Sequence, residues 1–305
     1  MNEQTISFIE FMKKNKSKMI SSSLEERREA IQFLGDRIQI PVNIEVTEET
    51  IGEVNCEWIS LKDASSDSVV INIHGGAYVM GSAYAARGTA ITLATLSRSR
   101  VISIDYRLAP ENPFPAALDD VLAVYRALLD KGISSSKIVL YGESAGGGLV
   151  LAVILMLRDF GKDQPAAVIC SSPWADLTNS GGSHTWEIEN KDFTLTTEDL
   201  NGQAFMYAGG ESLTNPYISP IFADFSNVPP LLIYAGTNEI LLNDSISLAE
   251  RATQAGVEVT IRVVDNMPHC FTAMTGLFEE ADQAMTEIAE FIIRKKNLYD
   301  WMNNR

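Results

Sequence analysis

Two hydrophobic periods alternate along most of the chain. Short apolar runs such as SVVINI and KIVLYG have the length and the β-branched content of buried strands. Longer stretches between them, such as PAALDDVLAVYRALLDKG, repeat their apolar residues with the spacing of an amphipathic helix. Strands that alternate with helices predict parallel β-α-β units. We therefore expect an α/β fold with a mostly parallel, twisted sheet flanked by helices.

The same pattern assigns most of the chain to individual elements. Residues 42–61 alternate and are rich in β-branched residues, which predicts antiparallel strands. Further strands are predicted over 68–76, 100–110, 136–144, 165–174, 229–239 and 257–266. Helices are predicted over 1–38 with a break near Gly35, and over 86–99, 115–132, 146–161, 243–256 and 276–302. An irregular stretch over 178–218 interrupts the alternation and is expected to be an insertion.

The composition is that of a globular protein. The 305 residues are 46% hydrophobic and 21% charged, and α/β folds often form one domain at this length, so we expect a single domain, 1–305. A net charge of −16 repels phosphate backbones, which argues against a nucleic-acid partner. The longest apolar run, 149–157, has nine residues, so we expect no insertion into a membrane, which requires roughly 20.

The three cysteines are Cys56, Cys170 and Cys270, and they are widely separated. An odd number without paired spacing predicts neither a disulfide framework nor a zinc site. It fits a reducing cytoplasm. The segment 1–20 lacks the continuous apolar stretch of a secretory signal, so we expect a cytoplasmic protein. The cysteine spacing gives no reason to expect a bound metal.

A serine surrounded by glycines lies between a predicted strand and a predicted helix, in the sequence YGESAGGG (141–148). In that setting Gly142-x-Ser144-x-Gly146 matches the G-x-S-x-G pattern of a nucleophilic serine. Small neighbours allow a sharp turn with Ser144 at its apex, and the helix that follows offers free N–H groups to a developing oxyanion. The fingerprints of nucleotide-binding loops are absent from the sequence. We therefore interpret Ser144 as a nucleophile, with a purely structural turn as the alternative.

A serine hydroxyl needs a base to become a good nucleophile, and the chain has three histidines. His74 lies beside glycines at the end of a predicted strand, and His184 lies in the predicted insertion. His269 follows the last predicted strand, where a loop at the carboxyl edge of the sheet could deliver it to Ser144. We expect His269 to be the base, although a lone loop histidine is often only a surface residue.

The third member of such a site is a carboxylate that holds the other nitrogen of the histidine. The chain order serine, acid, histidine places it between Ser144 and His269. Glu239 comes directly off a predicted strand, and Asp244 follows at the start of a predicted helix, where an aspartate suits the N-cap. We favour Glu239 as the acid and keep Asp244 as the alternative.

Together these motifs resemble those of the bacterial hormone-sensitive-lipase-like carboxylesterases of the α/β-hydrolase superfamily. The resemblance covers about residues 65–295. It rests on HGGAYVMGS (74–82), DYRLAPENPFPAALDD (105–120), GESAGGGL (142–149), SPWADLT (172–178) and EILLND (239–244), together with His269. It implies the α/β-hydrolase fold, no cofactor, and a mostly helical cap formed by about residues 1–40 and 178–218, which we name the cap segments.

The resemblance also implies an oxyanion hole. The backbone N–H groups of Gly76 and Ala77 would form it, completed by that of Ala145. Gly75 would permit the close turn, and His74 would brace the loop without taking part in the chemistry.

Four residues depart from the family pattern, of which Glu143 and Asn243 each stand where aspartate is commoner. Ala77 stands where a third glycine is usual, and its N–H is kept at little cost if φ is negative, which we expect. Ile240, directly after the favoured acid, replaces a frequent proline. The alignment of the motif still places Glu239 at the position of the catalytic acid.

These features predict a serine carboxylesterase that acts on short- to medium-chain esters through an acyl-enzyme. A formamide-cleaving amidase is the nearest alternative, because it uses a similar HGG loop. A non-catalytic ligand receptor on the same scaffold is a third possibility, but such receptors lose the histidine that is present here as His269. The resemblance also makes a homodimer joined at the predicted strand 257–264 possible.

Overall fold

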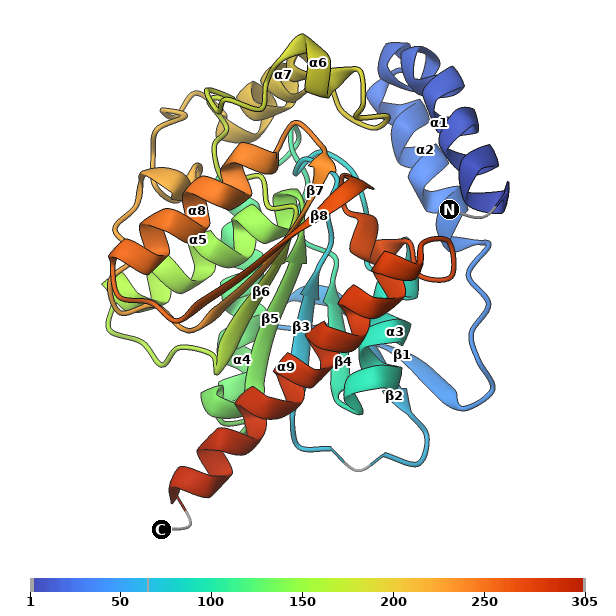
Figure 1. Cartoon of the computed structure of the whole chain (residues 1–305). Coiled ribbons are helices and arrows are strands. Elements are labelled where there is room, and N and C mark those ends of the chain that lie inside the picture. The colour runs from blue at the N-terminus through green and yellow to red at the C-terminus, as the bar shows by residue number, and fades with distance from the viewer. Residues whose placement is uncertain (1–2, 65, 304–305) are drawn as a thin grey trace.

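The computed structural model describes residues 3–64 and 66–303, and its strands form one sheet in the order β1-β2-β4-β3-β5-β6-β7-β8 (Figure 1). β1 and β2 pair antiparallel, β2 is also antiparallel to β4, and the other neighbours are parallel. The strands are β1 (Ile44–Ile51), β2 (Val54–Leu61), β3 (Val69–Ile73), β4 (Arg100–Ile104), β5 (Ile138–Glu143), β6 (Ala167–Ser171), β7 (Leu231–Asn238) and β8 (Val259–Pro268). The predicted α/β fold with a mostly parallel sheet is confirmed.

Each face of the sheet carries its own apolar core. Because successive side chains of a strand point to opposite faces, Ile71 and Val70 belong to different cores. Ile71 shares its core with residues of α4, α5 and α8, whereas Val70 shares the other core with residues of α3 and α9. Both strand residues are fully buried. The covering helices are α3 (Arg87–Ser97), α4 (Ala116–Asp130), α5 (Ala145–Asp159), α8 (Leu242–Gln254) and α9 (Glu279–Asn303). Burial on both faces explains why the central strands are continuous apolar runs in the sequence.

Four further helices lie beyond the carboxyl ends of the parallel strands (Figure 1). They are α1 (Glu3–Ser21), α2 (Leu24–Gly35), α6 (Trp186–Glu189) and α7 (Thr197–Ala208). Ser23 starts α2 through a capping box, because its side chain accepts from Glu26 N–H while the Glu26 carboxylate accepts from Ser23 N–H. This capping box divides the predicted N-terminal helical region into two helices. The second helix, α2, ends at Gly35, close to the predicted break.

Side chains tie the N-terminal helices to the segment 186–208. Arg27 on α2 pairs with Asp199 on α7, with Nη1 2.7 Å from Oδ1. Lys16 on α1 donates to the backbone carbonyls of Glu189 and Asp192 at 2.7 and 2.5 Å. These contacts hold the two cap segments against each other, although they are far apart in the sequence.

The remaining elements are short. They are the 3-10 turns η1 (Ser135–Lys137), η2 (Pro220–Phe222) and η3 (Phe271–Ala273). The stretch 178–218, predicted as irregular, contains α6 and α7, and the last helix begins at Glu279 instead of 276. None of the helices in the described ranges combines the length and hydropathy needed to cross a bilayer. Residues 1–2, which fall within the predicted cap, lie outside the described residues.

Candidate active site

Ser144 sits at the tip of a sharp turn between β5 and α5, with φ 54° and ψ −120°. We name residues 142–148 the serine turn. A Cβ atom at Gly146 would lie 2.1 Å from the carbonyl oxygen of Ile73, and one at Gly142 would lie 2.3 Å from that of Gly146. No side chain fits at these distances, so the two glycines of the G-x-S-x-G pattern are required by backbone crowding. The turn thereby presents the Ser144 side chain at the carboxyl end of the sheet.

The ring of His269 connects Ser144 to Glu239. Its Nε2 lies 3.0 Å from Ser144 Oγ, and its Nδ1 lies 2.7 Å from Glu239 Oε2. The other Glu239 oxygen accepts from Gly236 N–H at 2.9 Å. His269 directly follows β8 and Glu239 directly follows β7. The two strands are parallel neighbours, so their carboxyl ends deliver both residues to one place.

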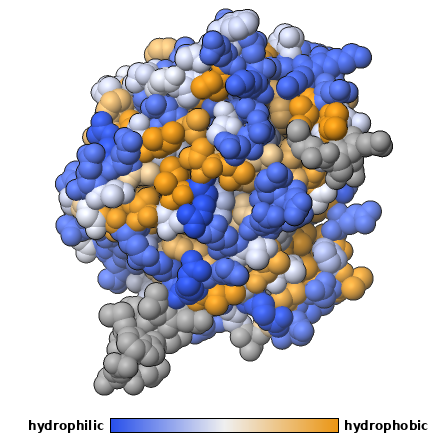
Figure 2. All heavy atoms as spheres, in the orientation of Figure 1, coloured by the Kyte–Doolittle hydropathy of each residue, from blue (hydrophilic) through white to orange (hydrophobic). Residues whose placement is uncertain are grey.

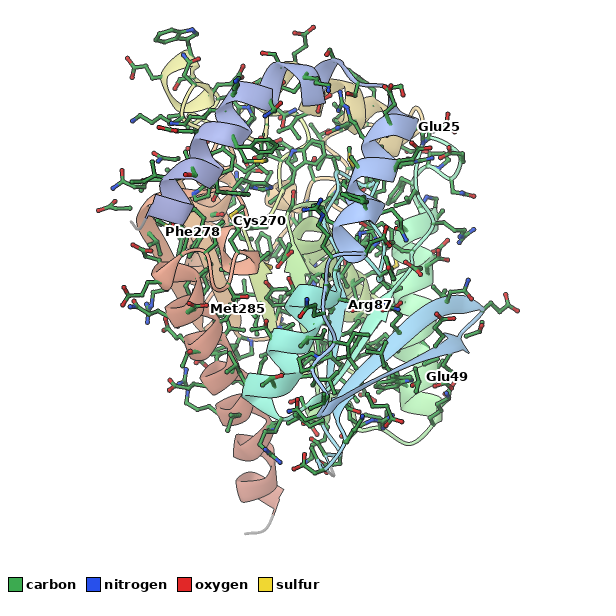
Figure 3. The ribbon with its side chains drawn as sticks, turned by 90° about the vertical axis from the view of Figure 1, so that its right-hand side faces the viewer. Glu25, Glu49, Arg87, Cys270, Phe278 and Met285 are labelled. Atoms are coloured by element: carbon green, nitrogen blue, oxygen red, sulfur yellow. The ribbon has the colours of Figure 1, made fainter. Side chains whose placement is uncertain are left out.

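Opposing influences act on the protonation of His269, which is buried. Burial is the largest influence and lowers the pKa of His269, whereas the Glu239 carboxylate bonded to Nδ1 raises it. Cys270 Sγ lies 3.4 Å from Nε2. Figure 3 shows Cys270 at the same end of the sheet as α1 and α2. The site therefore favours a positive charge on the imidazole once it has taken a proton.

Asp244, the alternative acid, is not brought to His269. It lies inside α8, and its Oδ2 accepts from the N–H groups of Ala175 and Asp176 at 2.9 and 2.8 Å. Burial raises the pKa of Asp244 to about 8. The prediction that Asp244 caps this helix is wrong. The N-cap position is Leu241, without a side-chain cap, because the Asp244 carboxylate reaches across to the loop after β6 instead.

The predicted oxyanion loop, residues 74–82, lies against the serine turn. A Cβ atom at Gly75 would be 3.2 Å from Ser144 Cβ, so the loop passes the serine at contact distance. Within the described ranges, no protein group accepts a hydrogen bond from the backbone N–H of Gly76, Ala77 or Ala145. The three N–H groups predicted to form the oxyanion hole thus have no partner among the described residues.

The expected negative φ at Ala77 is wrong. Its φ is 52°, and Tyr78 follows with φ 64°. Two successive left-handed residues turn the chain back, so that the N–H groups of Val79 and Met80 both donate to the Gly76 carbonyl at 3.0 Å. The turn requires this conformation, and an alanine in it is strained by about 1–2 kcal/mol.

His74 has the environment of a bracing residue. Its Nδ1 lies 2.7 Å from the Gly75 carbonyl, and its ring stacks on Tyr106 with centroids 4.2 Å apart. The Tyr106 hydroxyl in turn donates to the His74 carbonyl at 2.9 Å. Burial lowers the pKa of His74 to about 4, so the ring is neutral at pH 7. The third histidine, His184, bonds Thr197 in the cap segment through Nδ1.

A cavity of about 400 Å³ lies between the α1–α2 junction, α7 and Val79. Ser144, Glu239 and His269 do not line it, but Val79 is two residues from Ala77 in the oxyanion loop. Both polar and apolar residues line it, including Leu24, Arg27 and Gln203. Among the described residues, no cluster of three or more His, Cys, Asp or Glu side chains could hold a metal ion.

Arg28, which no pattern in the sequence marks, links α2 to the predicted oxyanion loop. Its Nε donates to the Val79 carbonyl at 2.7 Å, and its Nη2 donates to the Ala109 carbonyl at 2.8 Å. Both Nη atoms also bind the Glu111 carboxylate at 2.8 Å. The partners lie 51 to 83 residues away, so no local pattern could have revealed this role.

Known proteins are similar to this chain in both sequence and fold. Residues 70–273 match a family model described as the alpha/beta hydrolase fold. An acetyl-hydrolase of Streptomyces hygroscopicus is 36% identical over 80% of this chain and 81% of its own. An esterase of Acinetobacter venetianus is 37% identical over 75% of each.

Solved structures of esterases have the same fold over almost the whole chain. The crystal structure of an esterase from the bacterial hormone-sensitive lipase family matches with a TM-score of 0.92 and 34% identity, covering 97% of this chain and 99% of that one. A hormone-sensitive lipase from a metagenome library matches with a TM-score of 0.91 and 36% identity over the same shares. The chain belongs to the α/β-hydrolase family, as an enzyme of the bacterial hormone-sensitive-lipase-like esterases.

Proposed function

We propose that the protein is a serine carboxylesterase that hydrolyses short- to medium-chain esters through an acyl-enzyme. One observation carries the proposal: Ser144 Oγ, the His269 ring and the Glu239 carboxylate form a continuous chain of contacts of 3.0 and 2.7 Å. A serine, a histidine and an acid in this order are the groups that acyl transfer needs.

In the proposed mechanism, Ser144 Oγ attacks the carbonyl carbon of the ester while His269 Nε2 takes its proton. Glu239 holds Nδ1–H and stabilises the imidazolium that forms. The carbonyl oxygen becomes an oxyanion beside the N–H groups of Gly76, Ala77 and Ala145, with Gly75 allowing the close approach. The bond to the alcohol then breaks, and His269 returns its proton to the departing oxygen.

Water completes the cycle. His269 takes a proton from the water as the water attacks the acyl group on Ser144. When the second tetrahedral intermediate collapses, the bond from the acyl carbon to Ser144 Oγ breaks, Oγ takes the proton back from His269, and the acid is released. No metal or cofactor enters either half of this mechanism. The substrate is a small-molecule ester.

We also propose that the chain is one domain in which the cap segments screen the site. Ties such as Arg27 to Asp199 fasten these segments to each other, and Arg28 fastens α2 to the oxyanion loop. A covered site of this kind favours short acyl chains over long ones.

A cytoplasmic location and a homodimer are further proposals. The cysteines Cys56, Cys170 and Cys270 are free, which suits a reducing compartment. β8 is at the edge of the sheet, and its Val263 is 42% exposed. Figure 2 shows apolar residues gathered over α8 and β8, where a second copy could add its own edge strand.

Hydrolysis of p-nitrophenyl esters from acetyl to palmitoyl tests the proposed activity, with N-formyl anilides run in parallel. We expect kcat/KM to be highest for the short and medium esters, and S144A to lose activity on all of them while keeping the wild-type Tm. Preference for the anilides would favour an amidase. Full activity in folded S144A would contradict the proposal.

A further inference from the structure

The peptide groups of Ile240, the residue after Glu239, are held by a cap segment. Asp192 Oδ2 accepts from Ile240 N–H at 3.1 Å, and the Ser183 hydroxyl donates to the Ile240 carbonyl. Asp192 and Ile240 are fully buried, and Ser183 is 4% exposed. The main chain beside the proposed catalytic acid is thus fixed by residues 48 and 57 positions away in the sequence.

Asp192 is itself rigidly placed. Its Oδ1 accepts from the N–H and hydroxyl of Thr194, both at 2.8 Å, and from Leu195 N–H at 3.0 Å. The Lys16 ammonium of α1 donates to the Asp192 carbonyl, so a positive charge lies close to the buried carboxylate. Asp192 Oδ1 therefore binds the loop that contains Asp192, and Oδ2 remains available for Ile240 N–H.

The hydrogen bond to Asp192 depends on which residue type stands at position 240. Ile240 stands where the family pattern often has proline, and proline has no N–H to donate. This chain supplies a donor there and a buried acceptor opposite it.

We propose that Asp192 is a positioning residue that couples the cap segment 178–218 to the catalytic acid through Ile240. The inference rests on the proposed function, because it assigns Glu239 its role. Glu239 reaches His269 only while its own main chain is held. Without Asp192, the turn at 239–241 shifts and the contact between Oε2 and Nδ1 loosens.

The consequence for activity has a definite direction. A weaker contact with Glu239 destabilises the imidazolium in the transition state, so kcat falls while KM changes little. It also lowers the pKa of His269, because the carboxylate favours the charged ring. The acid limb of the pH–kcat/KM profile then moves to lower pH.

D192N is the sharpest variant. An asparagine whose oxygen takes the place of Oδ1 keeps the bonds to Thr194 and Leu195 but turns its NH₂ toward Ile240 N–H, so two donors face each other. We expect kcat to fall by about tenfold, KM to stay within about twofold, and the acid limb to move down. If folded D192N has the wild-type kcat and the wild-type acid limb of the pH–kcat/KM profile, the proposal is overturned.

Ile240 supplies an independent test of the same bond. I240P removes the N–H, whereas I240V keeps it and measures the effect of trimming the side chain alone. We expect I240P to move the acid limb further than I240V, and D192N to add little in the I240P background. The coupling would be contradicted if the acid limb of the pH–kcat/KM profile were the same in I240P and I240V. It would also be contradicted if D192N kept its full effect in the I240P background. If D192N does not fold, this pair still decides the question.

A readout without turnover separates this inference from the proposed function. The low-field ¹H NMR signal of His269 Nδ1–H reports its hydrogen bond to Glu239, and it can be recorded in the S144A protein. We expect D192N to move this signal upfield and I240V to leave it in place. An unmoved signal would refute the positioning role whatever the activity of S144A, whereas full activity in S144A would refute the proposed function alone.

Discussion

The serine turn (142–148) and the acid turn (239–244) deliver their residues to one histidine by different physical means. At Gly146, a Cβ atom would lie 2.1 Å from a backbone oxygen of β3, so the serine turn is shaped by main chain packed on main chain. The acid turn is held by side chains, among them that of Asp192, which accepts a hydrogen bond from Ile240 N–H. The first turn is therefore a property of the sheet, and the second depends on the cap segment.

This difference predicts how each turn responds to substitution. Replacing a glycine of the serine turn by alanine displaces backbone atoms and destabilises the fold. A change of one side chain at the acid turn leaves the fold intact and alters the rate or the pH dependence. The two turns can therefore be probed separately.

G146A tests the serine turn and has the largest expected effect. The added methyl cannot fit 2.1 Å from the Ile73 oxygen, so we expect loss of folded protein or a destabilisation of more than about 4 kcal/mol in urea unfolding. G202A in α7 is the matched control, because outside its own helix and chain neighbours no atom lies within 4 Å of the new Cβ. A G146A protein as stable as G202A would show that crowding does not shape the turn.

E239Q and D244N compare the two acids of the other turn. E239Q removes the charge that holds His269, and we expect kcat to fall by about 10⁴-fold with the fold retained. D244N keeps an oxygen for the N–H groups of Ala175 and Asp176, so we expect kcat to fall by less than about tenfold. A larger loss in D244N than in E239Q would reverse the assignment of the acid.

Asp244 also predicts a pH dependence of stability. Its pKa is about 8 in the folded protein, whereas an unfolded aspartate titrates near 4. Between these values the folded state holds a proton that the unfolded chain releases. The contribution of this carboxyl is therefore complete below about pH 4 and is lost as the pH rises through about 8. Thermal unfolding from about pH 5 to 8 should show a smaller decrease in Tm for D244N than for the wild type, and parallel curves would contradict the raised pKa.

A77G has the smallest expected effect. Glycine adopts the left-handed conformation of residue 77 without strain, but it also gains entropy in the unfolded chain. We expect the free energy of unfolding to rise by about 0.5–1 kcal/mol. Since the backbone N–H is kept, kcat/KM for p-nitrophenyl butyrate should change by less than about threefold. A loss of about 100-fold would mean that the alanine methyl itself shapes the oxyanion loop.

The sequence was sufficient to predict what short-range patterns determine. The apolar runs revealed the parallel strands, and G-x-S-x-G revealed the serine turn, because its glycines are dictated by local crowding. The position of His269 beside Ser144 followed from its place after the last strand. The preference for Glu239 over Asp244 agrees with the distance of 2.7 Å to His269.

Features that depend on distant partners were missed or mistaken. The left-handed φ of Ala77 follows from how its loop turns back on itself, which the residue type alone opposes. Asp244 was expected to cap a helix, but its carboxylate binds a loop 68 residues earlier. Arg28 and Asp192 act across the fold, and nothing in their local sequence marks them.

The most direct test is the labelling of Ser144 by a fluorophosphonate probe, followed by mass spectrometry of the modified peptide. The contact of 3.0 Å between His269 Nε2 and Ser144 Oγ predicts one adduct, on Ser144, formed at least about 100-fold more slowly in H269A and absent in S144A. An adduct on another residue, or labelling of Ser144 in folded H269A at the wild-type rate, would contradict a serine activated by this histidine.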